Sequence, residues 1–168
     1  IEWIGDIPEH WEVRKLKYVF DYILTGTTPS LKYFEDNGVL NWFTPGDLNT
    51  ELVKDSERKL KEKTPIRKYK KDSVLIVGIG ATSGKTSYSA KEGSTNQQIT
   101  SFHSVRYYNK FYFFYLKSSS NIFRNTANYT TLPIINNQYF KNYNIPLPPL
   151  SEQKKIASFL DKKTAEID

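Results

Sequence analysis

Cysteine is absent from the 168 residues of this chain, which excludes a disulfide framework and a metal site built from thiolates. Histidine occurs only at His10 and His103, far apart and without the spacing of a metal-binding pair. No apolar run is long enough to cross a bilayer, and no signal-peptide pattern opens the sequence. We therefore expect a cytoplasmic protein without membrane contact, and catalysis by a thiolate or a histidine cluster is poorly supported.

Acidic side chains are almost absent from residues 73–150, which carry seven basic residues and a single acidic one, Glu92. Residues 54–72 have a net charge of +5, whereas residues 1–53 have −5. A basic segment rich in Asn, Ser, Thr and Tyr is typical of a surface that faces a polyanion. The alternative is that the lysines only keep an aromatic-rich domain in solution, and charge alone leaves both open.

The most informative stretch is residues 73–98, SVLIVGIGATSGKTSYSAKEGSTNQQ. An apolar run at 74–77 predicts a buried strand, and residues 78–84 predict a glycine turn that presents a lysine and several hydroxyls. Such groups bind phosphates and base edges. The alternative is an ordinary glycine hairpin with a solvated lysine. The residues that we expect to attract phosphate, directly or at longer range, are Thr82, Ser83, Lys85, Thr86, Lys91 and Arg124.

A nucleotide-binding P-loop requires a glycine five residues before Gly84, and that position is Ile79. The residues after Lys85 also favour a strand, not the helix that follows a P-loop. ATP binding by this chain is therefore a remote interpretation. No two carboxylates have the spacing of an acid/base pair, and we interpret Asp47 as an acceptor for loop N–H groups.

Side-chain amides and an aromatic ring provide candidates for contacts with base edges. An amide pairs with adenine through two hydrogen bonds, and a tyrosine ring can stack. Amides also commonly hold neighbouring loops together, and polar loops such as residues 121–131 are common in any protein, so both interpretations stay open. The candidates for base contacts are Asn96, Gln97, Gln98, Asn128 and Tyr129.

Periodicity predicts the remaining elements. Leu16, Val19, Phe20 and Ile23 have helical spacing; residues 39–43 and 99–107 favour strands; and a helix is expected from Asn109 to residues 118–120. Residues 144–150 predict a rigid extended connector. Ser151 is expected to cap a last helix with an apolar stripe for a coiled-coil partner, formed by Ile156, Leu160 and Ile167. The boundary thus divides residues 1–150 from residues 151–168.

Five motifs occur together in one order, and their combination resembles the specificity subunit of type I restriction–modification systems. No single motif is diagnostic, but the set covers nearly the whole chain and matches one target-recognition domain with the start of its helical spacer. The motifs are residues 3–11 (WIGDIPEHW), 25–29 (TGTTP), 80–85 (GATSGK), 95–98 (TNQQ) and 146–153 (PLPPLSEQ).

The resemblance implies an α+β fold: a mixed α/β target-recognition domain with a twisted, largely antiparallel sheet, followed by the start of a long coiled-coil helix. It also implies a non-catalytic subunit in which two such domains each read half of a bipartite double-stranded DNA target. Modification subunits would bring S-adenosylmethionine and methylate adenine N6, and a restriction subunit would use ATP and Mg²⁺ to drive cleavage. This chain carries one domain, so we expect a half-length subunit that forms a homodimer, or a piece of a longer one with a second recognition domain.

The sequence thus predicts a DNA-recognition module that directs methylation and restriction by its partners. The alternative is a protein-interaction scaffold that uses only the proline-rich connector and the last helix. The two differ in salt dependence, because DNA binding weakens steeply with ionic strength and an apolar helix contact does not.

Overall fold

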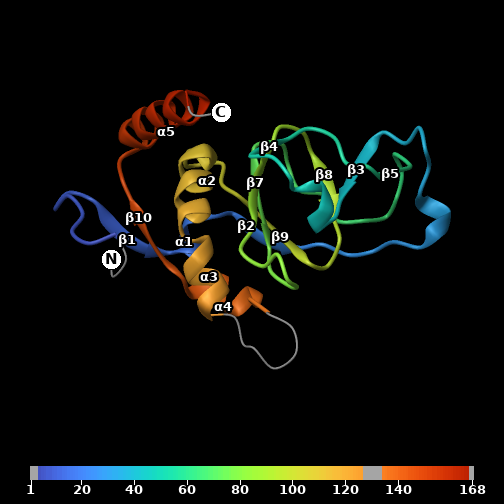
Figure 1. The fold of residues 1–168 in the computed structure, drawn as a ribbon, viewed down its shortest axis with the longest axis horizontal. Coiled ribbons are helices and arrows are strands. Elements are labelled where there is room, and N and C mark those ends of the chain that lie inside the picture. Colours follow the sequence, from blue (N-terminus) through green and yellow to red (C-terminus); the bar gives the residue numbers. More distant parts are fainter. Residues whose placement is uncertain (1–3, 127–133, 167–168) are drawn as a thin grey trace.

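The computed structural model describes residues 4–126 and 134–166, which form a mixed α/β structure (Figure 1). A strand-rich part lies at one end, and the helices with the paired strands β1 and β10 lie at the other. The strands are β1 (Glu12–Lys15), β2 (Tyr22–Thr25), β3 (Leu40–Phe43), β4 (Leu52–Val53), β5 (Lys59–Leu60), β6 (Ser73–Val77), β7 (Thr86–Ser89), β8 (Gly93–Thr95), β9 (Ile99–His103) and β10 (Asn144–Leu147). The helices are α1 (Leu16–Val19), α2 (Asn109–Ser118), α3 (Ser120–Thr126), α4 (Asn137–Asn142) and α5 (Leu150–Ala165), with short 3₁₀ turns at Leu31–Tyr33 and Pro45–Asp47.

The main sheet has five strands in the order β2-β9-β6-β7-β4. All its pairings are antiparallel except β4 with β7. A smaller sheet, β5-β3-β8, has one parallel and one antiparallel pairing, and β1 pairs antiparallel with β10. The predicted α+β fold with a largely antiparallel sheet is confirmed.

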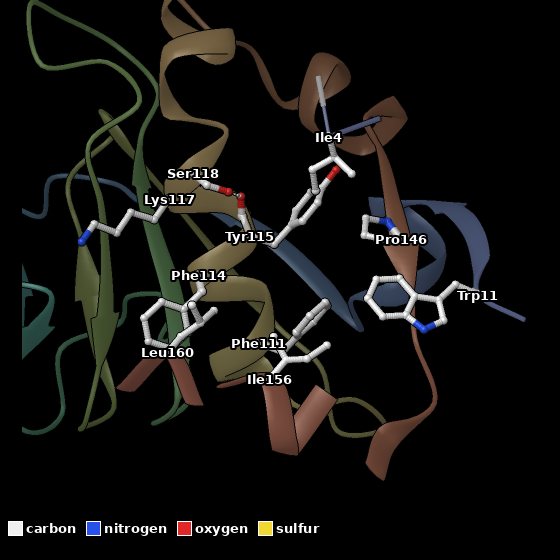
Figure 2. Close-up of a pocket in the computed structure, with 10 residues that line it drawn as sticks. All are labelled: Ile4, Trp11, Phe111, Phe114, Tyr115, Lys117, Ser118, Pro146, Ile156 and Leu160. Carbon is white, nitrogen blue, oxygen red and sulfur yellow. Dashed lines mark hydrogen bonds between the residues drawn. The ribbon is translucent and has the colours of Figure 1, made fainter. Parts of the chain in front are cut away.

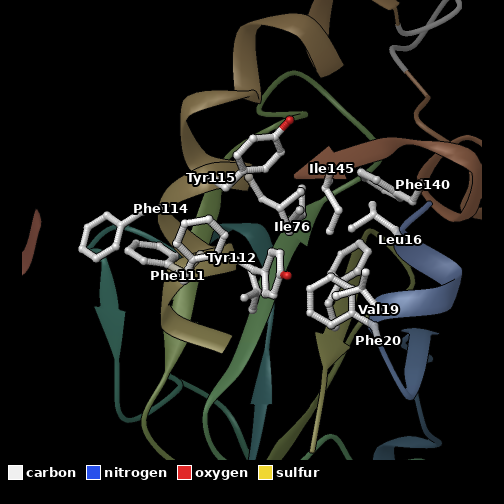
Figure 3. Packing of buried hydrophobic residues seen from close by; sticks show 14 of the residues in the cluster. Leu16, Val19, Phe20, Ile76, Phe111, Tyr112, Phe114, Tyr115, Phe140 and Ile145 are labelled. Carbon is white, nitrogen blue, oxygen red and sulfur yellow. The ribbon is translucent and has the colours of Figure 1, made fainter. Parts of the chain in front are cut away.

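Strand β6 lies at the centre of the core, and both of its faces are buried. Val74 and Ile76 face the aromatic side of α2, whereas Leu75 and Val77 belong to a second cluster with Phe43. Alternate residues of a strand point to opposite faces, so burial on both sides requires an unbroken apolar run. Figure 3 shows how rings from α2, α4 and the N-terminal part of the chain meet over Ile76.

The predicted helix over Leu16–Ile23 is wrong beyond its first turn. Helix α1 ends at Val19, Phe20 is extended, and Ile23 lies in β2. Leu16, Val19 and Phe20 are buried in the same cluster, and Ile23 packs against it. The apolar spacing therefore identified the buried residues correctly, but these residues belong to a helical turn and a strand and not to one helix. By contrast, the strand at 39–43, the strand from Ile99 and the helix from Asn109 are present.

The proline-rich connector is extended, as predicted, but it also forms strand β10. Pro146 is paired with Val13 in a two-stranded ribbon. Proline has no backbone N–H to donate, and it is tolerated here because both strands of the ribbon are edge strands. The expected cap of the last helix is wrong: α5 begins at Leu150, and the carbonyl of Pro149 accepts hydrogen bonds from the N–H groups of Glu152 and Gln153.

The apolar stripe of α5 packs within the chain. Ala157 is completely buried, and Ile156 and Leu160 are partly buried against the core cluster that includes α2. Gln153 is also buried, and its side chain joins the N–H of Tyr108 to the carbonyl of Pro148. Ile167 lies outside the described residues.

Candidate nucleic-acid interface

Several loops meet at one edge of the two sheets, which we call the turn edge (residues 26–29, 44–50, 78–85 and 96–98). Strand β6 is antiparallel to β7 and β9, and β9 is antiparallel to β2. The last residues of β6 and β2 therefore lie beside the first residues of β7 and β9. The N–H of Gly26 donates to the carbonyl of Ile99 at 3.1 Å, and the N–H of Gly78 donates to that of Gln98 at 2.7 Å. The topology thus brings the glycine turn and the amide segment together, as the sequence predicted.

The glycine turn is held by its own hydroxyl groups. Ser83 is buried, and its Oγ donates to the carbonyl of Gly80 at 2.6 Å; the Oγ1 of Thr86, also buried, donates to that of Gly84 at 2.9 Å. Gly84 has φ +88°, and a Cβ there would lie 2.6 Å from the carbonyl oxygen of Ser120. Thr82 is exposed at the tip of the turn.

Lys85 borders a groove of about 270 Å³ beside the turn. Its Nζ donates to the Oδ1 of Asn49 at 2.9 Å. Across the groove, Lys117 forms an ion pair with Glu51. The groove is therefore lined by two cations and one carboxylate, which leaves Lys85 as its cation without a carboxylate partner in the groove. On α3, the Nε of Arg124 donates to the carbonyl of Ser83 at 3.4 Å, which places its cation against the same turn.

Lys91 lies at the opposite end of β7 from Lys85. In the register of the hairpin, Thr86 pairs with Ile76 and Ser89 pairs with Ser73, so the β7–β8 connection projects away from the turn edge. Lys91 is 3.0 Å from Asp55, which also accepts from Lys59 at 2.9 Å. These hydrogen bonds, that of Lys59 first, lower the pKa of the Asp55 carboxyl. The structure therefore does not bring Lys91 to the other phosphate candidates.

Asn96 and Gln98 hold loops together. Asn96 is buried, its Nδ2 donates to the Oε1 of Gln98 at 2.9 Å, and its Oδ1 accepts from the Gln98 N–H at 3.0 Å. The Nε2 of Gln98 donates to the carbonyl of Ile79 at 3.2 Å and so joins this segment to the glycine turn. Gln97, between them, is exposed. Asn128 and Tyr129 lie outside the described residues.

From the sequence, Thr28 is included only as part of the motif at residues 25–29, and no role is predicted for Asn49. The Oγ1 of Thr28 donates to the Oε1 of Gln97 at 2.7 Å, and the two residues come from loops far apart in the chain. The hydroxyls of residues 25–29 were the available signal. The interpretation of Asp47 is confirmed, because its carboxylate accepts from the N–H groups of Thr44 and Glu57, both at 2.7 Å.

A second groove, of about 510 Å³, shares Lys117 with the groove beside the glycine turn (Figure 2). It is predominantly apolar and opens between α2, α5 and the start of the described chain. At its rim, the carboxylate of Glu152 accepts hydrogen bonds from the indole of Trp11 and the ring of His10, both at 2.8 Å. These two bonds, that of Trp11 first, lower the pKa of Glu152. The groove is lined by Ile4, Trp11, Phe111, Phe114, Tyr115, Lys117, Ser118, Pro146, Ile156 and Leu160.

Within residues 4–126 and 134–166, no three His, Asp or Glu side chains are grouped so that they could hold a metal ion. In the same ranges, no helix combines the length and the apolar character that crossing a membrane requires. The arrangement at the turn edge offers hydrogen-bond donors and cations, which are groups for binding.

A family model described as the type I restriction modification DNA specificity domain matches residues 8–168. The chain belongs to this family. The specificity domain is 32% identical over 168 residues to the type I restriction enzyme MjaIX specificity subunit of Methanocaldococcus jannaschii, with 94% of the chain and 38% of the relative covered. It is 28% identical over 159 residues to the MjaVIII specificity subunit of the same organism, with 92% and 36% covered. The domain thus spans well under half the length of these relatives.

Solved structures share the fold of the specificity domain. The HsdS subunit from Thermoanaerobacter tengcongensis matches with a TM-score of 0.79 at 21% identity, covering 97% of the domain and 39% of that chain. A chain from a study of complex assembly in a type I R-M system matches with a TM-score of 0.82, also at 21% identity, covering 97% of the domain and 40% of that chain. These likenesses support the architecture described above.

Proposed function

We propose that this specificity domain recognises a short sequence in double-stranded DNA as the specificity subunit, or half of one, of a type I restriction–modification complex. The observation that carries the proposal is the turn edge, where exposed hydroxyls, an exposed amide and Lys85 lie within one set of loops, and Arg124 of α3 is bonded to the glycine turn. Family membership supports it, as does the scarcity of carboxylates in residues 73–150. Phosphate contacts position a protein on DNA, and base contacts give specificity.

We assign phosphate binding to Lys85, Thr82 and Arg124, with the hydroxyls of Ser83 and Thr86 holding the glycine turn in shape. Lys91 adds long-range attraction from the other end of β7. Gln97 is the leading candidate for a base edge because its amide is exposed. Asn96 and Gln98 would act mainly by orienting it, and Asn128 and Tyr129 remain candidates by sequence.

The domain itself would perform no catalysis. Modification subunits would supply S-adenosylmethionine and methylate adenine N6, and a restriction subunit would supply ATP- and Mg²⁺-dependent cleavage. Helix α5 would continue into the spacer and join a second recognition domain or a second copy of the chain. Ile156 and Leu160 are only partly buried and line the apolar groove, so a partner helix would contact them there. Ile167 remains a candidate for the same helix interface by sequence.

The decisive experiment is selection from a random duplex pool with the chain assembled with its modification subunits and S-adenosylmethionine. Enrichment of a motif of about 3–5 base pairs that contains an adenine is expected, because one module reaches few base edges. Salt-sensitive binding without an enriched motif would contradict sequence recognition.

A protein-interaction scaffold is the second candidate, and the apolar groove favours it. Its occupant would bind through apolar contacts that change little with ionic strength, whereas DNA affinity falls steeply as salt rises. Titration of the complex with DNA between 50 and 200 mM salt, a range over which about 6–10 phosphate contacts lose roughly 10³–10⁵ in affinity, separates the two.

A further inference from the structure

Arg58 is stacked on two aromatic rings at the strand-rich end of the molecule. Its guanidinium carbon lies 3.7 Å from the centroid of the Phe34 ring and 5.3 Å from that of Trp42. The two rings meet edge to face, 5.0 Å apart and inclined at 84°. We call Phe34 and Trp42 the aromatic shelf. A guanidinium over such faces is attracted by their negative charge density and is held in one plane.

The shelf is itself fixed. Trp42 is only 3% exposed, and its indole Nε1 donates to the carbonyl of Thr27 at 3.0 Å. Phe34 is anchored through a β-bridge to Leu60, and the N–H of Trp42 donates to the carbonyl of Arg58 at 3.3 Å. The arginine is therefore joined to its platform through both its backbone and its side chain.

The guanidinium N–H groups of Arg58 have no hydrogen-bond partner among the described residues, and the side chain is exposed. Neighbouring cations differ: Lys59 and Lys91 both pair with Asp55. A stacked arginine with its planar set of five donors unused has the features of a contact for paired acceptors. Its side chain has also lost much of its freedom before binding, which lowers the entropic cost of the contact.

The shelf borders the turn edge. Thr27 accepts the hydrogen bond from the Trp42 indole, and the next residue, Thr28, donates to Gln97. One dipeptide thus fixes the platform of Arg58 and the exposed amide.

We propose that Arg58 is a DNA-contact residue of the specificity domain, whose guanidinium donates a pair of hydrogen bonds to the O6 and N7 of a guanine or to two phosphate oxygens. The inference rests on the function proposed above and extends the contact surface from the turn edge to the small sheet. Guanine offers a nitrogen and an oxygen, and phosphate offers two oxygens, in the plane of the two guanidinium donors.

The test uses the chain assembled with its modification subunits and the duplex that selection enriches. Arg58→Lys keeps the charge and loses the planar fork, Arg58→Gln loses both, and Phe34→Leu removes the stacking ring and keeps the arginine. Arg14→Lys is the matched control, because Arg14 is exposed, ion-paired with Glu12 and located in β1 at the other end of the molecule (Figure 1). Thermal melting of each variant checks that it is folded.

We expect Arg58→Lys to weaken binding about 5- to 150-fold, the range of one bidentate pair, while Arg14→Lys changes it less than about twofold. Phe34→Leu should give a smaller loss in the same direction. If the acceptor is guanine, repeated selection with Arg58→Lys loses the preference at one base pair. If it is phosphate, Arg58→Gln weakens all duplexes equally and lowers the salt slope by about one.

Wild-type affinity and an unchanged motif for folded Arg58→Lys and Arg58→Gln would overturn the proposal. If the unsubstituted complex enriches no motif, the function proposed above fails separately. Arg58 is then judged on mixed-sequence duplex, where an unchanged salt slope in Arg58→Gln rejects the contact and a reduced slope supports it as a phosphate contact.

Discussion

The hydroxyl of Thr28 donates a 2.7 Å hydrogen bond to the amide oxygen of Gln97, and both side chains are exposed. The bond occupies the oxygen and leaves the two amide N–H donors directed elsewhere. A surface glutamine ordinarily samples many rotamers, and this contact restricts it. The pair therefore presents donors in a defined direction at the turn edge.

Gln97→Ala is expected to relax the selected motif at one position, at a cost of about 1–3 kcal/mol for the preferred base pair. Thr28→Val removes the hydroxyl while preserving the shape of the side chain, and it should give a weaker loss at the same position, about 0.5–1.5 kcal/mol. Selection followed by competition binding measures both. Relaxation at two different positions, or none, would contradict the idea that the two residues act as a pair.

Lys85→Ala should weaken binding to every duplex equally and reduce the slope of log affinity against log salt by about one, because it removes a phosphate contact. Lys91→Ala is the matched comparison, since Lys91 lies at the other end of β7 and pairs with Asp55. Its effect should be smaller and should disappear at high salt. Equal slopes for wild type and Lys85→Ala would show that this lysine does not contact phosphate.

Gly84→Ala should destabilise the fold by more than Gly5→Ala, as measured by urea unfolding. Both glycines have positive φ, +88° and +79°, and an alanine in that conformation costs about 1–2 kcal/mol. At Gly84 the new Cβ would also meet the backbone of Ser120 at 2.6 Å, whereas nothing lies within 4 Å at Gly5. Similar losses for the two variants would mean that the contact between the glycine turn and α3 is loose.

Trp11→Phe should raise the pKa of Glu152 toward its ordinary value of about 4.3, because the indole N–H is the larger of two causes that lower it. A lowered carboxyl pKa in the folded state stabilises the fold above the unfolded-state value and loses that effect as the pH falls through the folded value. The variant should therefore be less sensitive to acid below about pH 4.3. NMR titration of the Glu152 carboxyl carbon measures the shift, and an unchanged value would remove Trp11 as its cause.

Elements governed by local pattern could be predicted from the sequence. The run Val74–Val77 had to be a buried strand, and the aromatic spacing after Asn109 had to be a helix, because burial and period are properties of neighbouring residues. The helix predicted over Leu16–Ile23 was wrong because one apolar surface is shared by a helical turn and a strand. The spacing of apolar residues does not reveal where a helix ends.

The site was predictable as a neighbourhood and not as a set of contacts. The glycine turn and the amides were placed together because both follow adjacent parts of the chain, and the sheet confirms it. The Thr28–Gln97 bond joins residues 69 positions apart, and Arg58 stacks on rings contributed by two other segments. Such pairings depend on strand order. Lys91 shows the converse, since proximity in sequence to Lys85 did not put it at the same end of the sheet.

The ribbon of β1 and β10 has one more consequence. Lys15 pairs with Asn144, and Trp11 is bonded to Glu152, so the chain enters and leaves the body of the domain at the same place. The whole segment between β1 and β10 therefore starts and ends at this pair of strands. Helix α5 is also held by α2 and the residue before it, because Gln153 accepts from the N–H of Tyr108 and Asp161 pairs with Lys110. A different segment inserted between the two strands would therefore keep the direction of α5 only if it kept this surface of α2.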